Sequence, residues 1–248
     1  MEKRINFKAR ARLMPQIGEQ LIKNESIALL ELVKNSYDAD APDVRVEMWD
    51  VDKPNVGKII VKDNGSGMDL SIIENSWMEI GTDNKENLLK EYIENNEKSE
   101  LGRLPMGEKG IGRFGVHKLG SKIILITRMK GKLEVVVKID WTEFEQADYL
   151  EQVPITVIER EPEYFVGEKK GTYIEITELK SVWTRTKFRD VYRSVMSLHS
   201  PFESIQSFNV DFQTNHKEWL DGLLTVSEIK NDALFFADVE IEEDEIVT

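Results

Sequence analysis

With 248 residues, the chain is long enough for one large domain, or for one domain with a smaller appendage. Hydrophobic residues make up 40% and charged residues 32%, as in ordinary folded proteins, and the longest apolar run, 233–237, is too short to span a membrane. The net charge of −13 argues against nucleic-acid binding by this segment alone, and the lack of cysteine and of a secretory apolar stretch predicts a cytoplasmic protein without a membrane partner.

Hydrophobic periodicity indicates both helices and strands in the first eighty residues. Pro15 argues against a helix through that point, whereas apolar residues after Gly18 recur at helical spacings until shortly before Pro42. The predicted elements are an extended arm over 1–15, a helix over 18–39 with a break near Asn24, strands over 44–48 and 59–61, and a helix over 69–79.

The rest of the chain begins with charged, glycine-containing sequence and continues with β-branched runs. Its predicted elements are a charged helix over 85–97, a mobile loop over 98–110, a short helix after Gly112, strands over 122–128, 132–140, 153–159 and 171–178, a helix over 184–198 and a strand over 208–212. Because helices and strands occur in separate runs, we expect an α+β sandwich with a mainly antiparallel sheet. We expect a first domain over 1–200, and an appendage or the start of an incomplete second domain over 201–248.

The first candidate site segment is ELVKNSYDADA, residues 31–41. Glu31, Asn35 and Asp38 stand at positions i, i+4 and i+7 of the predicted helix, so two carboxylates and an amide share one stripe. A solvated polar helix face has the same pattern, so this stripe alone leaves the function open.

The second segment, VKDNGSGMD, residues 61–69, directly follows an apolar strand. Asp63 stands at the strand end, and the glycines at 65 and 67 permit positive φ and let a ligand approach the backbone. A hairpin turn would explain the DNG triplet equally well. However, a helix rather than a partner strand is predicted to follow, which favours a binding turn.

The third segment is GEKGIGRFG, residues 107–115. Closely spaced glycines before a helix can present backbone N–H groups to phosphates, and Lys109 and Arg113 add positive charge. The glycines also match the dinucleotide pattern G-x-G-x-x-G, but no strand is predicted before them, and neither a Walker loop nor a protein-kinase signature is present.

Taken in order, these segments resemble the nucleotide-binding boxes of the GHKL superfamily of gyrase B, heat-shock chaperones, histidine kinases and MutL, also called the Bergerat fold. GTYIEI, residues 171–176, is similar to a fourth box, in which Gly-Thr opens a strand. The resemblance covers about 18–178 and implies a two-layer α/β sandwich with a mixed, mostly antiparallel sheet and helices on one face. The third box looks closest to the chaperone-like branch, and histidine kinases are disfavoured because no histidine precedes Glu31.

The resemblance implies a role for each box. Glu31 would be the general base for the water that attacks the γ-phosphate of ATP. Asn35 would give its amide oxygen to Mg²⁺. Asp63 would accept a hydrogen bond from the adenine amino group, which guanine lacks at that position.

Further nucleotide-binding residues follow from the same resemblance. Gly67 would let the purine edge lie close, Met68 would pack against the base, and Thr172 would support Asp63 and the base through its hydroxyl. Thr82 and Lys85 would flank the nucleotide, although an exposed lysine at a helix start explains Lys85 as well. The phosphate loop would comprise Gly107, Lys109, Gly110, Ile111, Gly112, Arg113 and Gly115.

The expected function is a Mg²⁺-dependent ATPase whose nucleotide cycle closes a lid over 82–110 and drives conformational change or homodimerisation through the N-terminal arm. A nucleotide-sensing interaction module with little turnover is the alternative from another class, and a protein kinase of the same superfamily is a third. Full activity is expected to require a further domain, because no lysine or arginine for the γ-phosphate is identified. The sequence names no protein client.

Overall fold

The structure is a computed structural model that describes residues 6, 8–79, 90, 92, 94–95, 99–106, 115–198, 208–223, 240–242 and 245–247. Seven strands form one sheet in the order β5-β4-β3-β6-β2-β1-β7, and every neighbouring pair is antiparallel except β1 and β7. The strands are β1 Asp43–Trp49, β2 Lys58–Asp63, β3 Gly120–Arg128, β4 Glu134–Asp140, β5 Thr156–Arg160, β6 Gly171–Leu179 and β7 Asn209–Thr214. This mixed, mostly antiparallel sheet confirms the predicted α+β class.

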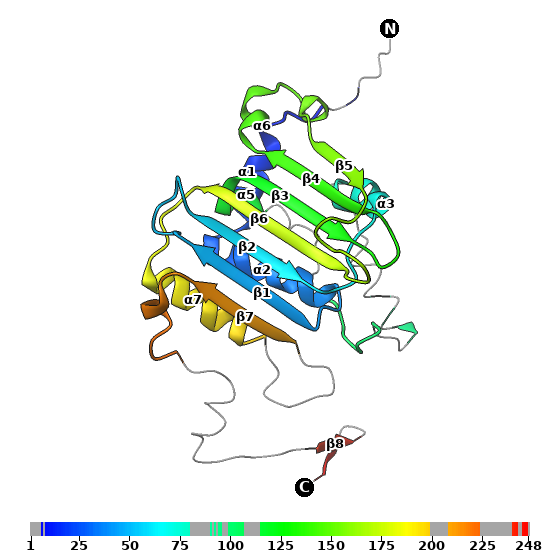
Figure 1. Cartoon of the computed structure of the whole chain (residues 1–248), viewed down its shortest axis with the longest axis vertical. Helices are drawn as coiled ribbons and strands as arrows, with labels where there is room; N and C mark the ends of the chain where they lie inside the picture. Colours follow the sequence, from blue (N-terminus) through cyan, green and yellow to red (C-terminus); the bar gives the residue numbers. More distant parts are fainter. Residues whose placement is uncertain are drawn as a thin grey trace.

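Helices cover one face of the sheet, behind the strands in Figure 1. The helical elements are α1 Leu13–Leu21, α2 Glu25–Asp38, α3 Leu70–Ile72, the π-helix η1 Ile73–Trp77, α5 Val116–Leu119, α6 Thr142–Gln146, η3 Leu150–Gln152, α7 Arg185–Met196 and η4 Lys217–Trp219. A separate hairpin joins β8 Glu240–Glu242 to β9 Glu245–Val247. Among the described residues, no helix is long and apolar enough to cross a membrane.

The core lies between the sheet and its helices because alternate strand residues face inward. Val44, Val46 and Met48 of β1 are buried, while the residues between them are at least partly exposed. Leu29 of α2 and Phe188 of α7 are fully buried in the same core. The helix α2 therefore lies directly over the sheet, and Asn35 and Asp38 of its polar stripe line the cavity described below.

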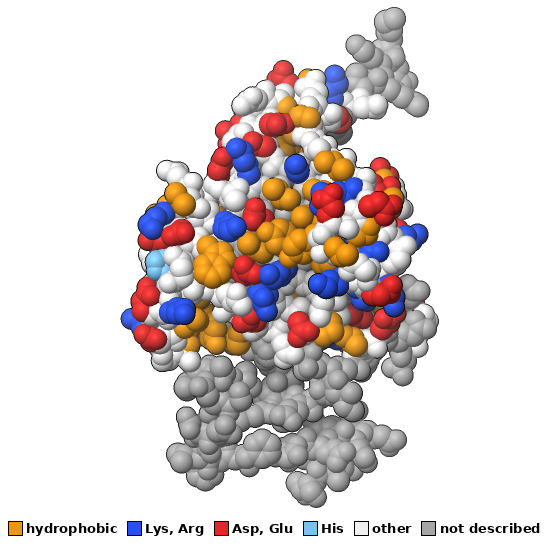
Figure 2. All heavy atoms as spheres, viewed as in Figure 1, with side chains coloured by type: hydrophobic (Ala, Val, Ile, Leu, Met, Phe, Trp, Pro, Cys, Tyr) orange, Lys and Arg blue, Asp and Glu red, His pale blue; other side chains and the backbone are white. Residues whose placement is uncertain are grey.

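No helix of the described residues covers the opposite face of the sheet, and Figure 2 shows hydrophobic side chains across its middle among charged ones. Cross-strand pairing places Ile126, Val136 and Ile158 on this face. Its charged side chains form cross-strand ion pairs, which are Arg45 with Asp211, Lys62 with Glu47 and Lys58 with Glu175. Opposite charges on adjacent strands stabilise such a solvated face.

Two expectations for the N-terminal region have different outcomes. The predicted break near Asn24 is confirmed, because the Asn24 side chain caps α2 by accepting a hydrogen bond from the N–H of Ile27 at 2.9 Å. The prediction of an extended arm over 1–15 is wrong from Leu13 onward, because α1 begins there and contains Pro15. Proline is tolerated in the first turn of a helix, where its missing N–H would have no intrahelical partner.

The segment after β2 and the segment after residue 200 also depart from the sequence expectations. The helix predicted over 69–79 is a short α-turn continued by a π-helix, and the charged helix predicted over 85–97 lies mostly outside the described residues. Strand β7 pairs in parallel with β1, and Phe212 joins the core. Strand β7 thus adds to the same sheet as β1, and the division of the chain into domains stays a prediction.

Candidate nucleotide-binding site

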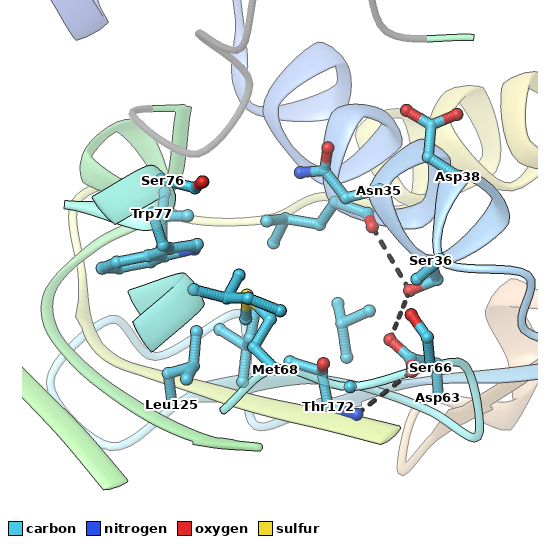
Figure 3. Close-up of a pocket in the computed structure, with 17 residues that line it drawn as sticks. Asn35, Ser36, Asp38, Asp63, Ser66, Met68, Ser76, Trp77, Leu125 and Thr172 are labelled. Carbon is cyan, nitrogen blue, oxygen red and sulfur yellow. Dashed lines mark hydrogen bonds between the residues drawn. The ribbon is translucent and has the colours of Figure 1, made fainter. Parts of the chain in front are cut away.

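A cavity of about 380 Å³ lies between α2 and the sheet, at the end where β2 stops and β6 begins (Figure 3). Its polar side chains lie mainly at one end, around Asp63, while Met68, Leu125 and Trp77 line the other part. The remaining lining residues are Leu32, Asn35, Ser36, Asp38, Ala39, Val61, Ser66, Gly67, Ile72, Ser76, Val116, Thr172 and Ile174. A largely apolar cavity of this size with a few convergent polar groups is typical of a small-molecule site.

Asp63 ends β2 with its carboxylate held by three donors. The Ser36 hydroxyl donates to Oδ2 at 2.9 Å, and the N–H groups of Gly65 and Thr172 donate to Oδ1 at 3.0 and 3.1 Å. A carboxylate offers about four acceptor positions. Among the described residues, one acceptor position on Oδ2 therefore has no donor, and Asp63 lines the cavity.

Burial raises the pKa of Asp63 to about 6, although the hydrogen bonds from Gly65, Ser36 and Thr172 act in the opposite direction. The desolvation of the charged form therefore outweighs these hydrogen bonds. A raised carboxylate pKa inside a cavity is typical of functional sites.

Three glycines let the backbone segments at the Asp63 end of the cavity approach one another closely. At Gly67, φ is +67° and a Cβ would lie 1.9 Å from the carbonyl oxygen of Arg128. At Gly171, φ is +134° and a Cβ would lie 2.1 Å from the carbonyl oxygen of Asp63, while a Cβ at Gly65 would lie 2.6 Å from that of Ala39. The glycines of the DNGSG turn are thus required by backbone contacts within the fold, whatever they do for a ligand.

Replacing Gly67 by alanine is therefore expected to lower the free energy of unfolding by about 2 to 4 kcal/mol, from left-handed strain plus overlap with Arg128. Gly131→Ala is the matched control, because Gly131 has φ of +75° but, apart from its chain neighbours, none of the described residues has an atom within 4 Å of the position of a Cβ. The control should lose only about 1 kcal/mol. Urea unfolding measures both, and equal losses would show that the close contact at Gly67 does not constrain the fold.

Thr127 of β3 is a site residue that the sequence analysis missed. Its side chain is fully buried, and its hydroxyl accepts from the N–H of Met68 at 2.9 Å and donates to the carbonyl oxygen of Gly171 at 3.0 Å. Its Oγ1 also lies 3.2 Å from the Thr172 hydroxyl oxygen. Thr127 thus joins the second and fourth boxes. The sequence does contain a signal for it. Thr127 continues the alternation of Ile123 and Leu125, so a hydroxyl is predicted at a position of β3 that faces the core.

Ser36 and Trp77 were also missed. Ser36 is buried on α2, and its hydroxyl donates a hydrogen bond to the Asp63 carboxylate. Its position directly after Asn35 could have indicated a role in the site. Trp77 belongs to η1 and lines the cavity across from Asp63 in Figure 3, whereas the sequence analysis gave it no role in the site. A π-helix often occurs at a functional site, but the hydrophobic periodicity of the sequence could not predict one here.

The structure places Asn35 and Glu31 differently. Asn35 lines the cavity, with its amide above the cavity in Figure 3. Glu31 stands one turn earlier on α2 but is not among the residues that line the described cavity. Its carboxylate makes an ion pair with Lys34 at 2.8 Å, and a quarter of its side chain is exposed.

Some of the other predicted site residues lie among the described residues, and the rest lie outside them. Gly67, Met68 and Thr172 line the cavity together with Asp63. Gly115 precedes α5 and packs against α2, where a Cβ would lie 3.4 Å from the Cα of Ala28. Outside the described residues lie Thr82, Lys85, Gly107, Lys109, Gly110, Ile111, Gly112 and Arg113.

An α/β sandwich with an aspartate at the floor of a mostly apolar cavity defines the class as a nucleotide-binding domain. The family model described as histidine kinase-, DNA gyrase B-, and HSP90-like ATPase matches residues 23–172, which is more than half of the chain. The chain therefore belongs to this family, as its resemblance to the GHKL superfamily predicted, and membership implies ATP binding. A comparison with curated proteins found no match. The chaperone-like branch remains a prediction.

Proposed function

We propose that this chain binds Mg²⁺–ATP in the Asp63 cavity and hydrolyses it. The observation that carries the proposal is the Asp63 carboxylate, which is fixed by three donors and retains one acceptor position beside an apolar cavity. An adenine amino group is a donor of the kind this position lacks, while Met68 and Leu125 offer apolar contact to the base. Guanine would place a carbonyl oxygen against the carboxylate and would be rejected.

Hydrolysis would be carried out by the polar stripe of α2. Glu31, one turn before Asn35 on α2, is the residue to which the resemblance to the family gives the role of general base, and it would accept a proton from the water that attacks the γ-phosphate. The amide oxygen of Asn35 fits Mg²⁺, which prefers oxygen ligands and takes most of them from phosphates and water. Bound Mg²⁺ would neutralise phosphate charge.

The Glu31–Lys34 ion pair favours a second candidate function, a nucleotide-sensing module with little turnover. In the described conformation Lys34 occupies the carboxylate that would serve as general base. Lys34 engages Oε1 in this pair, so Oε2 could still accept a proton from water in the hydrolysing cycle, whereas in a sensing module the pair would persist when ATP binds. Lid closure over 82–110, homodimerisation through the N-terminal arm and a contribution from a further domain also belong to the proposed cycle.

Calorimetric titration of the purified chain with Mg²⁺–ATP and Mg²⁺–GTP tests the binding proposal. We expect one ATP per chain and an affinity for GTP about 100-fold lower, because a buried acceptor facing the guanine carbonyl is left unpaired. Equal affinity for both nucleotides would remove the role of Asp63 in choosing the base, and absence of ATP binding would remove the proposed function.

A further inference from the structure

His216 lies two residues after the end of β7 and contacts three other residues. Its Nε2 lies 2.9 Å from Asp52 Oδ1, in the turn between β1 and β2, and its Nδ1 lies 3.1 Å from Glu218 Oε1 of η4. Its ring also stacks on that of Trp219, with the two centroids 4.2 Å apart and the ring planes at 10°. The His216 side chain is only 20% exposed. These contacts hold the ring between two carboxylates.

The two hydrogen bonds of His216 depend on the protonation state of its ring. A neutral imidazole has one N–H donor and one acceptor nitrogen, whereas an ionised carboxylate only accepts. Both bonds therefore form together only when both ring nitrogens carry protons, as in the imidazolium ion. A positive charge also favours the stacking on Trp219, because cations are attracted to the face of an indole ring.

The surroundings of His216 shift its titration in the direction that this geometry requires. Burial by itself would lower the pKa of His216, but the hydrogen bonds and charges of Asp52 and Glu218 raise it above its ordinary value of 6.5. In turn, the hydrogen bond from His216 holds the pKa of Asp52 below its ordinary value. The charged ring is thus retained at a pH at which an isolated histidine would have begun to lose its proton.

Other charged groups stand on the elements around this cluster. They are Lys53 and Asp50 of the β1–β2 turn, which pair with each other, Lys217 of η4, and Arg189 of α7, which donates to the carbonyl oxygens of Trp219 and Asp221. Among these residue types, histidine is the one that ordinarily changes its charge near neutral pH. A change of pH in that range therefore acts on the cluster through His216.

Asn215 joins the same two segments without a charge of its own. Its Oδ1 accepts from the N–H of Asp50 at 3.0 Å, and its Nδ2 donates to Asp50 Oδ1 at 3.3 Å. An amide does not titrate. The β1–β2 turn is therefore attached to the segment after β7 by one residue that titrates and by a neighbouring one that does not.

We propose that His216, Asp52 and Glu218 form a pH-sensitive switch, which attaches the segment after β7 to the β1–β2 turn when the ring is charged and weakens this attachment when the ring loses a proton. The neutral ring keeps a single donor, so one of its two carboxylate partners is lost. Figure 1 shows β7 at the edge of the sheet, beside β1. The switch lies at the end of β2 away from Asp63, and the inference does not depend on the proposed ATP binding.

Thermal unfolding of the full chain between about pH 5.5 and 9 tests the switch by comparing the wild type with His216→Gln. The contribution of His216 to stability is present in full below its ordinary pKa of 6.5 and is lost as the pH rises through the raised pKa of the folded chain. We expect His216→Gln to lower the unfolding midpoint by about 2 to 4 °C at pH 5.5 and by less than about 1 °C at pH 9. The titration of Asp63 occurs in both chains and cancels in the difference.

Asn215→Ala is the matched control, because it removes the neighbouring attachment to the same turn without removing a titrating group. Its unfolding midpoint should fall by an amount that does not change with pH. A second measurement uses nitrogen NMR of the imidazole ring, which distinguishes the imidazolium ion from the neutral tautomers. The His216 ring should titrate above pH 6.5 in the wild type and at a lower pH in Asp52→Asn, which removes one of the two negative charges.

Several results would overturn the switch and leave the proposed ATP binding untouched. One is a midpoint difference between the wild type and His216→Gln that is constant with pH. Another is the same pH dependence in Asn215→Ala as in His216→Gln, and a third is a His216 ring that titrates below pH 6.5. If His216→Gln does not fold, the NMR titrations of the wild type and of Asp52→Asn carry the test.

Discussion

Replacing Glu31 by alanine is expected to lower the rate of ATP hydrolysis by a factor of about 100 to 10,000, the usual contribution of a general base. ATP affinity should stay within about threefold of the wild type. The reason is structural, since Glu31 does not line the described cavity, whereas Asp63 and the apolar residues that would hold adenine are untouched by the change.

Phosphate release at saturating Mg²⁺–ATP, together with calorimetric titration, measures the two effects separately. Glu145→Ala is a suitable control, because this exposed glutamate of α6 lies on an element that contributes nothing to the cavity. Unchanged turnover in Glu31→Ala would assign the base elsewhere. A wild-type chain that binds ATP without measurable turnover would favour the nucleotide-sensing module.

Asp63→Asn is expected to weaken ATP binding by about 100-fold or more while leaving the fold intact. The asparagine Oδ1 can still accept from Gly65 and Thr172, and its Nδ2 can donate to Ser36. Its second N–H would then point at the adenine amino group, so a donor would face a donor. Calorimetry measures the loss, and circular dichroism verifies the fold. Retained ATP affinity would show that Asp63 does not recognise adenine.

The same variant should be more stable than the wild type near neutral pH. Because the pKa of Asp63 is raised to about 6, the folded chain binds a proton at pH 5 that the unfolded chain has largely lost. The free energy of unfolding attributable to Asp63 therefore falls as pH rises from about 4 to 7, by roughly 1 to 3 kcal/mol. The asparagine side chain has no such titration, so the stability advantage of Asp63→Asn should grow from pH 5 to pH 7.5.

Thermal unfolding at several pH values, with the wild type and Asp63→Asn measured side by side, checks this difference. An advantage that is constant with pH would contradict the raised pKa. ATP binding by the wild type should also weaken below about pH 6, because the protonated carboxyl loses acceptor capacity. In contrast, the residual binding of Asp63→Asn should show no such dependence on this group.

Local sequence signals located most elements well. The alternating buried residues of β1 and the helix cap at Asn24 depend on residues that are close together in the chain. Both features can therefore be recognised in the sequence. Pro15 misled because a proline excludes helix in an interior position but not in the first turn, and the helix start at Leu13 had no capping signal. The strand β7 could be located, but its partner could not, because β1 lies more than 160 residues earlier.

The chemical groups of the site could be identified from the order of the boxes, which indicated Asp63, Asn35 and Gly67 together. The residues that hold these groups in place could not be identified in this way. Thr127 acts only because β3 pairs with β6, and the clash that makes Gly67 necessary involves a carbonyl oxygen of Arg128, 61 residues later in the chain. Contacts over such separations leave no spacing pattern in a single sequence.

The sequence by itself determined the family, most of the strands and longer helices in their order, and the chemical types available for binding a nucleotide, because each depends on residue identity and short-range periodicity. Only the tertiary structure decided how the Asp63 carboxylate is satisfied, why its pKa rises, and that the N–H of Met106 donates to Asp38 on α2. Those properties arise from desolvation and from hydrogen bonds between segments that are brought together when the sheet and α2 pack.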